Sequence, residues 1–149
     1  MYQLKPATEA DIDQLLALME ILFAIEEDFQ FDAELQAQGL KLLINGRTGI
    51  VQTARDKGKI LGMVTGQLVI STAEGRLSLL VEDLVVDEQC RGKGVGRSLL
   101  AALGKWSKQQ GASRMQLLAD QNNFVGLEFY KRCGWQRTQL VCLRNYTDR

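Results

Sequence analysis

The sequence predicts a single mixed α/β domain spanning residues 1–149, with a sheet that begins antiparallel and ends in a parallel crossover. Two segments with helical spacing of apolar residues come first, and three strand-like segments rich in Val, Leu and Ile follow them. A strand–glycine turn–helix–strand unit comes next, which is the pattern of a parallel connection. No low-complexity linker or internal repeat divides the chain, and its length suits one core.

The first half is predicted from periodicity and turn signals. The expected elements are a strand over residues 2–5, helices over 9–25 and 32–44, and strands over 50–55, 59–70 and 77–86. Thr8 is the expected N-cap of the first helix, with Asp11 in the capping-box position. Asn45-Gly46 ends the second helix, and Asp56-Lys57-Gly58 is a hairpin signal. Three successive antiparallel strands therefore follow the helices.

The second half contains the parallel crossover. The expected elements are a helix that opens at the glycine turn 92–96 and ends at Gly111, a short buried strand over 115–119, a helix over 123–132 stopped by Gly134, and a tail over 135–144 that returns to the sheet.

Composition excludes several classes of chemistry. The chain has 18 basic and 18 acidic residues, so no basic surplus points to nucleic acid as a partner. It has no histidine, which excludes Ser-His-Asp and Cys-His sites and histidine-ligated zinc, and we expect no metal. Three cysteines without a CxxC pair indicate free thiols (Cys90, Cys133 and Cys142). Without a signal peptide or membrane-spanning run, we expect a cytoplasmic protein with no membrane partner.

The segment from Val85 to Leu100 carries the strongest functional signal. It contains a strand, a turn with glycines at 92, 94 and 96, and then a helix. Unpaired amides at a helix start favour an anion, and three cations surround the turn (Arg91, Lys93 and Arg97). The residues indicate a phosphate or pyrophosphate cradle; the alternative is a glycine turn that only permits tight strand–helix packing. The spacing fits neither the Walker pattern nor the dinucleotide-binding G-x-G-x-x-G.

The same segment resembles the signature R/Q-x-x-G-x-G/A of the GNAT (Gcn5-related N-acetyltransferase) family, matched by Arg91, Gly94 and Gly96. A second family motif is matched downstream by Asn123, Phe129-Tyr130 and Gly134-Trp135. The family usually has alanine at Gly126 and phenylalanine at Trp135, and these departures affect only local helix packing. The two motifs lie within residues 82–135, and the predicted order of elements extends the resemblance over nearly the whole chain.

The resemblance implies a GNAT-like fold in which two central strands splay apart and acetyl-coenzyme A (acetyl-CoA) enters the gap. The pantetheine arm then hydrogen-bonds a free strand edge, and amides of the glycine turn hold the pyrophosphate. The residues expected to bind acetyl-CoA are Leu84, Val85 and Val86 on the edge, Arg91, Gly92, Lys93, Gly94, Val95, Gly96, Arg97 and Ser98 at the turn, and Asn123 and Tyr130 beyond it. Asn123 either contacts the pantetheine arm or orients the neighbouring helix.

Two residues are candidates for proton transfer. The Tyr130 phenol is the candidate general acid for the leaving thiolate, against the alternative of a core aromatic residue. Glu82 is the candidate base, directly or through water, against the alternative of a solvated side chain. Asp83 projects to the opposite face of an ideal strand, although a bulge would reverse this. Acidic residues at Glu26, Glu27, Asp28, Asp32 and Glu34 either attract a cationic amine or form a solvated loop.

These inferences favour an N-acetyltransferase that moves an acetyl group from acetyl-CoA to a primary amine, expected to be a small molecule, by direct attack. One alternative is a CoA-binding module that senses acyl-CoA without turnover, and another is transfer of a different acyl group. The sequence leaves the acceptor and the oligomeric state open, with a homodimer as one expectation from the family.

Overall fold

The computed structural model describes residues 1–26 and 28–149. Glu27, one of the acidic residues singled out above, lies outside the described residues. Contacts divide the chain into two compact units, residues 1–117 and 118–149, and each is described by itself.

The first unit is built on a five-stranded sheet in the order β1-β2-β3-β4-β5. The strands are β1 (Gln3–Pro6), β2 (Gly49–Asp56), β3 (Lys59–Ser71), β4 (Arg76–Val86) and β5 (Ala112–Leu117). The first four pair in antiparallel fashion, whereas β4 and β5 are parallel. This is the mixed sheet that the sequence predicts, antiparallel first and with one parallel crossover.

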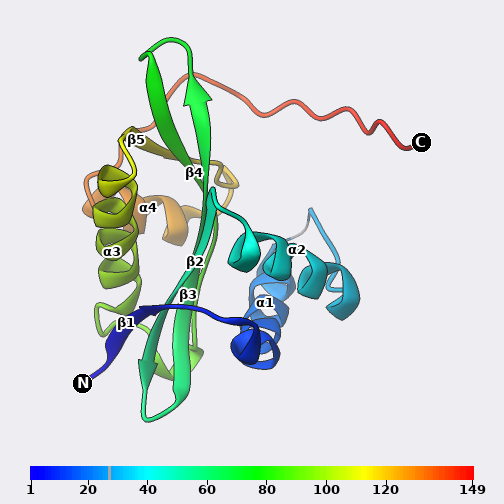
Figure 1. The fold of residues 1–149 in the computed structure, drawn as a ribbon, viewed down its shortest axis with the longest axis vertical. Helices are drawn as coiled ribbons and strands as arrows, with labels where there is room; N and C mark the ends of the chain where they lie inside the picture. The colour runs from blue at the N-terminus through cyan, green and yellow to red at the C-terminus, as the bar shows by residue number, and fades with distance from the viewer. Residues whose placement is uncertain (27) are drawn as a thin grey trace. The chain divides into compact units, whose positions relative to one another are not determined.

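Helices cover both faces of this sheet (Figure 1). A one-turn 3₁₀ helix, η1 (Glu9–Asp11), leads into α1 (Ile12–Ile25), and α2 (Ala33–Asn45) follows. These two α-helices lie on one face, while the crossover helix α3 (Val95–Gln109) lies on the other (Figure 1). The predicted first helix is thus divided into a tight turn and an α-helix, with the amide of Thr8 donating to the Asp11 carboxylate at 2.8 Å.

The core between the sheet and the α1–α2 layer is apolar. Its buried members are Leu15, Leu18, Met19, Leu22, Leu40, Val51, Ile60, Met63 and Val85. On the other face α3 buries Leu99 and Leu103 completely. The buried side chains of α1 and of α3 recur with the helical spacing that predicts these two helices, and their burial holds the helices against the sheet.

The second unit contains α4 (Phe124–Arg132), followed by Gly134 with a φ of 91°. The predicted return of residues 135–144 to the sheet is wrong, because the tail, all of it described, contains no strand. Its apolar residues Leu140, Val141 and Leu143 are 79–89% exposed. Loose alternation predicts a strand only where the backbone finds a partner, and here the side chains bury nothing.

β5 also differs from its prediction. It begins three residues earlier than expected and its residues are exposed or half-buried, not buried. The reason is its place at the edge of the sheet, where β4 is its neighbour on one side. Over the residues that the structure describes, no helix is long and apolar enough to span a membrane.

Candidate active site

The parallel strands β4 and β5 separate partway along β4. Their ladder runs from the Leu77–Ala112 pair to the Val81–Leu117 pair, where β5 ends. β4 continues to Val86 with β3 on its other side. The backbone edge from Glu82 to Val86 therefore has no partner from β5, which is the splayed strand pair that the fold predicts. We call the point after Val81, where the two strands part, the fork.

A β-bulge in β4 lies directly beyond the fork. Val81 pairs with Gly66 and Leu84 pairs with Val64, so Glu82 and Asp83 both lie opposite Thr65. The expectation that Asp83 projects away from Glu82, as in an ideal strand, is therefore wrong, and the reversal by a bulge is what occurs. Glu82 and Asp83 therefore stand next to each other on β4, at the start of its free edge.

Thr65 holds Asp83 through two hydrogen bonds. The Thr65 hydroxyl donates to Asp83 Oδ2 at 3.0 Å and accepts from the Asp83 amide at 3.0 Å. Thr65 is 1% exposed and Asp83 is half-buried, whereas Glu82 is exposed. Burial raises the pKa of the Asp83 carboxyl, the Thr65 hydrogen bond lowers it, and the negative charge of Glu82 raises it further.

The glycine turn follows β4 and a short 3₁₀ helix, η2 (Glu88–Cys90). Gly92 and Gly94 have φ values of 73° and 83°, a region that other residues rarely adopt. Gly94 is the N-cap of α3, and the amide of Ser98 donates to its carbonyl at 3.0 Å. The amides of the first turn of α3, Val95 and Gly96 among them, consequently have no carbonyl within the helix to bond. A Cβ at Gly92 or Gly94 would meet no atom within 4 Å, so the turn is open to a ligand.

Basic side chains are held over this turn. Arg91 Nε donates to the Val86 carbonyl at 3.1 Å, and Lys93 Nζ donates to the Gln89 carbonyl at 3.0 Å. Both cations are thereby anchored to the segment that joins the free edge of β4 to α3. Together with the helix dipole, they make this end of α3 electropositive.

The hydroxyl of Ser98, an expected pyrophosphate contact, lies 2.8 Å from the Tyr2 hydroxyl, and the two are hydrogen-bonded. Tyr2 also donates to the Gly94 carbonyl at 3.4 Å. Sequence reasoning missed Tyr2, because a contact over 96 residues leaves no local signal. The N-terminal segment thus braces the start of α3 from the side of β1.

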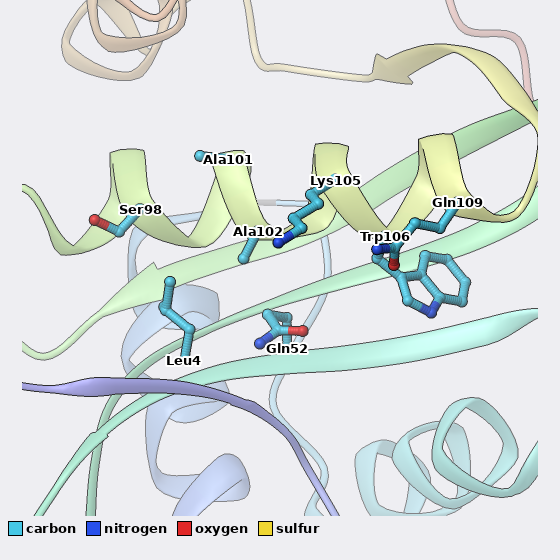
Figure 2. A pocket seen from close by; sticks show the side chains of 8 residues that line it. All are labelled: Leu4, Gln52, Ser98, Ala101, Ala102, Lys105, Trp106 and Gln109. Carbon is cyan, nitrogen blue, oxygen red and sulfur yellow. The ribbon is translucent and has the colours of Figure 1, made fainter.

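A groove of about 530 Å³ lies on that same side of α3, facing β1 and β2. Figure 2 shows Leu4 and Gln52 directed at the helix, across from Ala102 and Lys105. Among the described residues of its lining, Ser98 is the one predicted site residue and none is a carboxylate. Because β1 and β2 are at the opposite end of the strand order from β5, the groove is separate from the fork.

The remaining predicted residues belong to the second unit. Asn123 is the N-cap of α4, and its Oδ1 accepts from the Gly126 amide at 3.0 Å, so it orients this helix. The Tyr130 ring makes edge contacts with Phe129 and Trp135, at centroid distances of 5.3 and 5.8 Å. The participation of Asn123 and Tyr130 in the site stays a prediction.

The acidic residues after α1 include one with a local structural role. Asp32 caps α2 by accepting hydrogen bonds from the amides of Glu34 and Leu35, at 3.0 and 3.2 Å. Its conformation is explained by the helix alone, so attraction of a cationic amine by this region stays a prediction.

Comparison with known proteins agrees with this architecture. The Acetyltransferase (GNAT) family profile matches residues 14–135. The uncharacterized N-acetyltransferase MJ1207 of Methanocaldococcus jannaschii is 25% identical over 142 residues, which cover 94% of this chain and 63% of that protein. The chain thus spans less than two thirds of the length of the curated relatives it matches.

Two solved structures show the same fold. An aminoglycoside acetyltransferase, meta-AAC0020, from an uncultured soil metagenomic sample and in complex with sisomicin, superposes with a TM-score of 0.78 at 22% identity, covering 98% of this chain and 95% of that one. Aminoglycoside N-acetyltransferase AAC(6')-Iy in complex with CoA has a TM-score of 0.85 at 14% identity, covering 99% and 95%. With the family profile matching most of its length and the forked sheet in place, this chain belongs to the GNAT acetyltransferase family.

Proposed function

We propose that the protein transfers an acetyl group from acetyl-CoA to a primary amine. The observation that carries the proposal is the continuity between the free edge of β4, from Glu82 to Val86, and the open glycine turn at the start of α3. An extended ligand with amides at one end and a pyrophosphate at the other matches this order of groups. The proposal treats residues 1–149 as one catalytic domain.

The chain offers a separate group for each part of acetyl-CoA. Backbone groups of Leu84, Val85 and Val86 would hydrogen-bond the pantetheine amides in the manner of an added strand. The amides from Arg91 to Ser98 would hold the pyrophosphate, and the nearby cations would balance its charge. The open space beside Gly92 and Gly94 fits this role, because phosphate oxygens need close approach to the backbone. When bound, the thioester supplies the electrophilic carbonyl.

Catalysis in this proposal rests on placement and proton transfer. The amine attacks the thioester carbonyl directly, without an acyl-enzyme, so proximity at the fork supplies much of the rate. Tyr130 protonates the departing thiolate, and one of the two carboxylates at the bulge of β4 accepts the amine proton directly or through water. Asn123 holds the helix that carries Tyr130.

A small-molecule amine is the proposed acceptor. The two structural neighbours named above are aminoglycoside acetyltransferases, one of them in complex with sisomicin. Their identities of 22% and 14% support the fold, and the acceptor class is our extension from it.

Isothermal titration with acetyl-CoA, CoA, ATP and NAD, followed by an assay of thiol release against a panel of amines, tests the proposal. We expect selective binding of acetyl-CoA and CoA, and thiol release that depends on one class of amine. Binding of CoA with no turnover of any amine would favour the acyl-CoA-sensing alternative. Preference for ATP or NAD would refute the assignment of the turn.

A further inference from the structure

We infer that Asp83, not Glu82, is the carboxylate that accepts the proton of the acceptor amine at the fork, and that Thr65 is the residue that positions it. This inference rests on the proposed function and names its base. Glu82 is the candidate base from the sequence, whereas the geometry of the bulge favours Asp83.

Asp83 lies at the fork, where the edge of β4 becomes free. The β4–β5 ladder ends at Val81, and the bulge occupies the next two positions, so Asp83 lies where the free edge begins. Thr65, its partner, is two residues from Met63 on β3 and therefore on the same face of the sheet. Met63 packs in the core under α1 and α2. Asp83 is thus directed to the face that carries the α1–α2 layer.

A hydrogen bond from Thr65 fixes the Asp83 side chain in place. The exposed Glu82 side chain makes no hydrogen bond to the described residues, whereas Asp83 has a short side chain with one oxygen fixed at 3.0 Å by Thr65. Its other oxygen, Oδ1, accepts no hydrogen bond from the described part of the chain. In that part every fully buried side-chain oxygen has a hydrogen-bond partner, so an oxygen without a partner is not fully buried. Oδ1 therefore reaches solvent, and this oxygen is available to an amine or to one bridging water.

The environment of Asp83 also suits its carboxylate to accept a proton. Thr65 from β3 and the Glu82 carboxylate from β4 act on the Asp83 carboxyl. The helix α1 packs against β4, and its buried side chains are apolar (Ile12, Leu15, Leu18, Met19 and Leu22). Burial here raises the pKa of Asp83, and Glu82 adds to the effect. A carboxylate whose pKa is displaced toward neutrality is a better general base than an ordinary one.

Two protons leave the nitrogen of the acceptor during the reaction. The ammonium form of the acceptor gives one proton to the Asp83 carboxylate and becomes a neutral amine. Its nitrogen then forms the C–N bond as the C–S bond breaks. The thiolate gains a proton from Tyr130, and the second proton of the nitrogen passes through water to restore the Tyr130 phenol. Asp83 releases its proton to solvent, so the products are an amide, a free thiol and one proton.

The test uses the full chain and the best amine from the panel. Asp83→Asn keeps a side-chain oxygen that can accept from Thr65, and it should lower kcat/KM at pH 7 by about 10²-fold or more, a general-base effect. It should also abolish the acidic limb of the pH profile. The matched variant Glu82→Gln should change kcat/KM by less than about threefold and keep that limb.

Thr65 variants separate positioning from folding. The hydrogen bond from Thr65 lowers the pKa of Asp83, so Thr65→Val should move the acidic limb to higher pH, while Thr65→Ser should leave it in place. Because the pKa of Asp83 is raised in the folded state, the protonated carboxyl contributes to stability. This contribution is complete below the unfolded-state pKa and is lost as pH rises through the folded-state pKa. Asp83→Asn should therefore be at least as stable as wild type to urea at pH 8, which shows that lost activity is not lost folding.

Three outcomes are distinct. Loss of the acidic limb in Asp83→Asn alone supports the inference. Loss of the limb in Glu82→Gln, with Asp83→Asn unchanged, overturns it and leaves the proposed function standing. No thiol release by wild type with any amine overturns the proposed function, and the inference with it.

Discussion

Replacing Gly94 by alanine tests whether the glycine turn binds the pyrophosphate of CoA. Gly94 has a φ of 83° and open space around its missing Cβ. The methyl group therefore causes no clash in the free protein, and the effect comes from the backbone. An L-residue in this conformation costs roughly 1–2 kcal/mol relative to glycine. In a chain of this length each kcal/mol lowers Tm by about 2–4 °C, so we expect a loss of about 2–8 °C.

Relief of that strain turns the amides of the turn away from the ligand. The loss of one hydrogen bond to a charged group weakens binding by about 1.5–3 kcal/mol. Because 1.4 kcal/mol is a factor of ten, the Kd for CoA should rise about ten- to hundredfold in Gly94→Ala. Titration calorimetry at 25 °C, where both proteins are folded, measures this change.

Gly75 provides the matched control. It has a φ of 68° and equally open space, and it lies in the hairpin at the other end of β4 from the glycine turn. Gly75→Ala should lower Tm to a similar extent and leave the Kd for CoA unchanged. If Gly94→Ala loses thermal stability but binds CoA like wild type, or if both variants bind equally weakly, the turn does not bind the pyrophosphate.

Three further predictions concern other parts of the molecule. Tyr130→Phe should lower kcat by about 10²-fold with little change in the KM for acetyl-CoA, and an unchanged kcat would remove Tyr130 as general acid. Arg55 bonds both oxygens of the Asp11 carboxylate, at 3.0 and 3.2 Å, and lowers its pKa, so Arg55→Met should reduce the free energy of unfolding at pH 7 by about 1.5–3 kcal/mol. The stability that comes from the lowered pKa of Asp11 is present above the unfolded-state pKa and is lost as pH falls through the folded-state pKa. In urea titrations the free energies of unfolding of the two proteins should therefore converge as pH falls below about 4. A difference that stays constant with pH would contradict a stabilising Arg55–Asp11 ion pair. A Cβ at Gly126 would lie 2.6 Å from Asn123 Nδ2, so Gly126→Ala should leave stability within about 0.5 kcal/mol of wild type, because better helix propensity offsets the displaced cap. In an Asn123→Ala background the same substitution should stabilise by about 1 kcal/mol in urea titrations, and equal effects in both backgrounds would rule out this coupling.

Sequence reasoning succeeds where the physical requirement is local. Gly92 and Gly94 could be singled out because positive φ selects glycine, and the structure has both in that region. The helices α1 and α3 could be predicted because one stripe of each is buried, and the buried stripe recurs with the helical period. The hairpin at Lys57-Gly58 has positive φ at both residues, as the turn signal predicts.

It fails where the requirement is a partner elsewhere in the chain. The tail at 135–144 has enough apolar residues to suggest a strand, yet a strand exists only with a neighbour, and local composition does not supply one. The hydrogen bond between Tyr2 and Ser98 is a contact that sequence reasoning does not predict, whereas the tail is a strand that it predicts wrongly. Two ordinary residues 96 positions apart meet at the start of α3. Neither fact has a local signal.

The bulge that directs Asp83 shows why even a correctly predicted strand can mislead about a site. In β4 the odd-numbered Leu79, Val81 and Val85 are all nearly inaccessible, which fits one unbroken strand. Leu79, however, faces Gly66 together with Leu103 of α3, whereas Val85 packs in the core under α1 and α2. Residues six apart in a regular strand share a face, so the strand must gain a residue between them. Because helices cover both faces, burial stays periodic while the face changes, and alternation alone does not reveal that Glu82 and Asp83 both lie opposite Thr65.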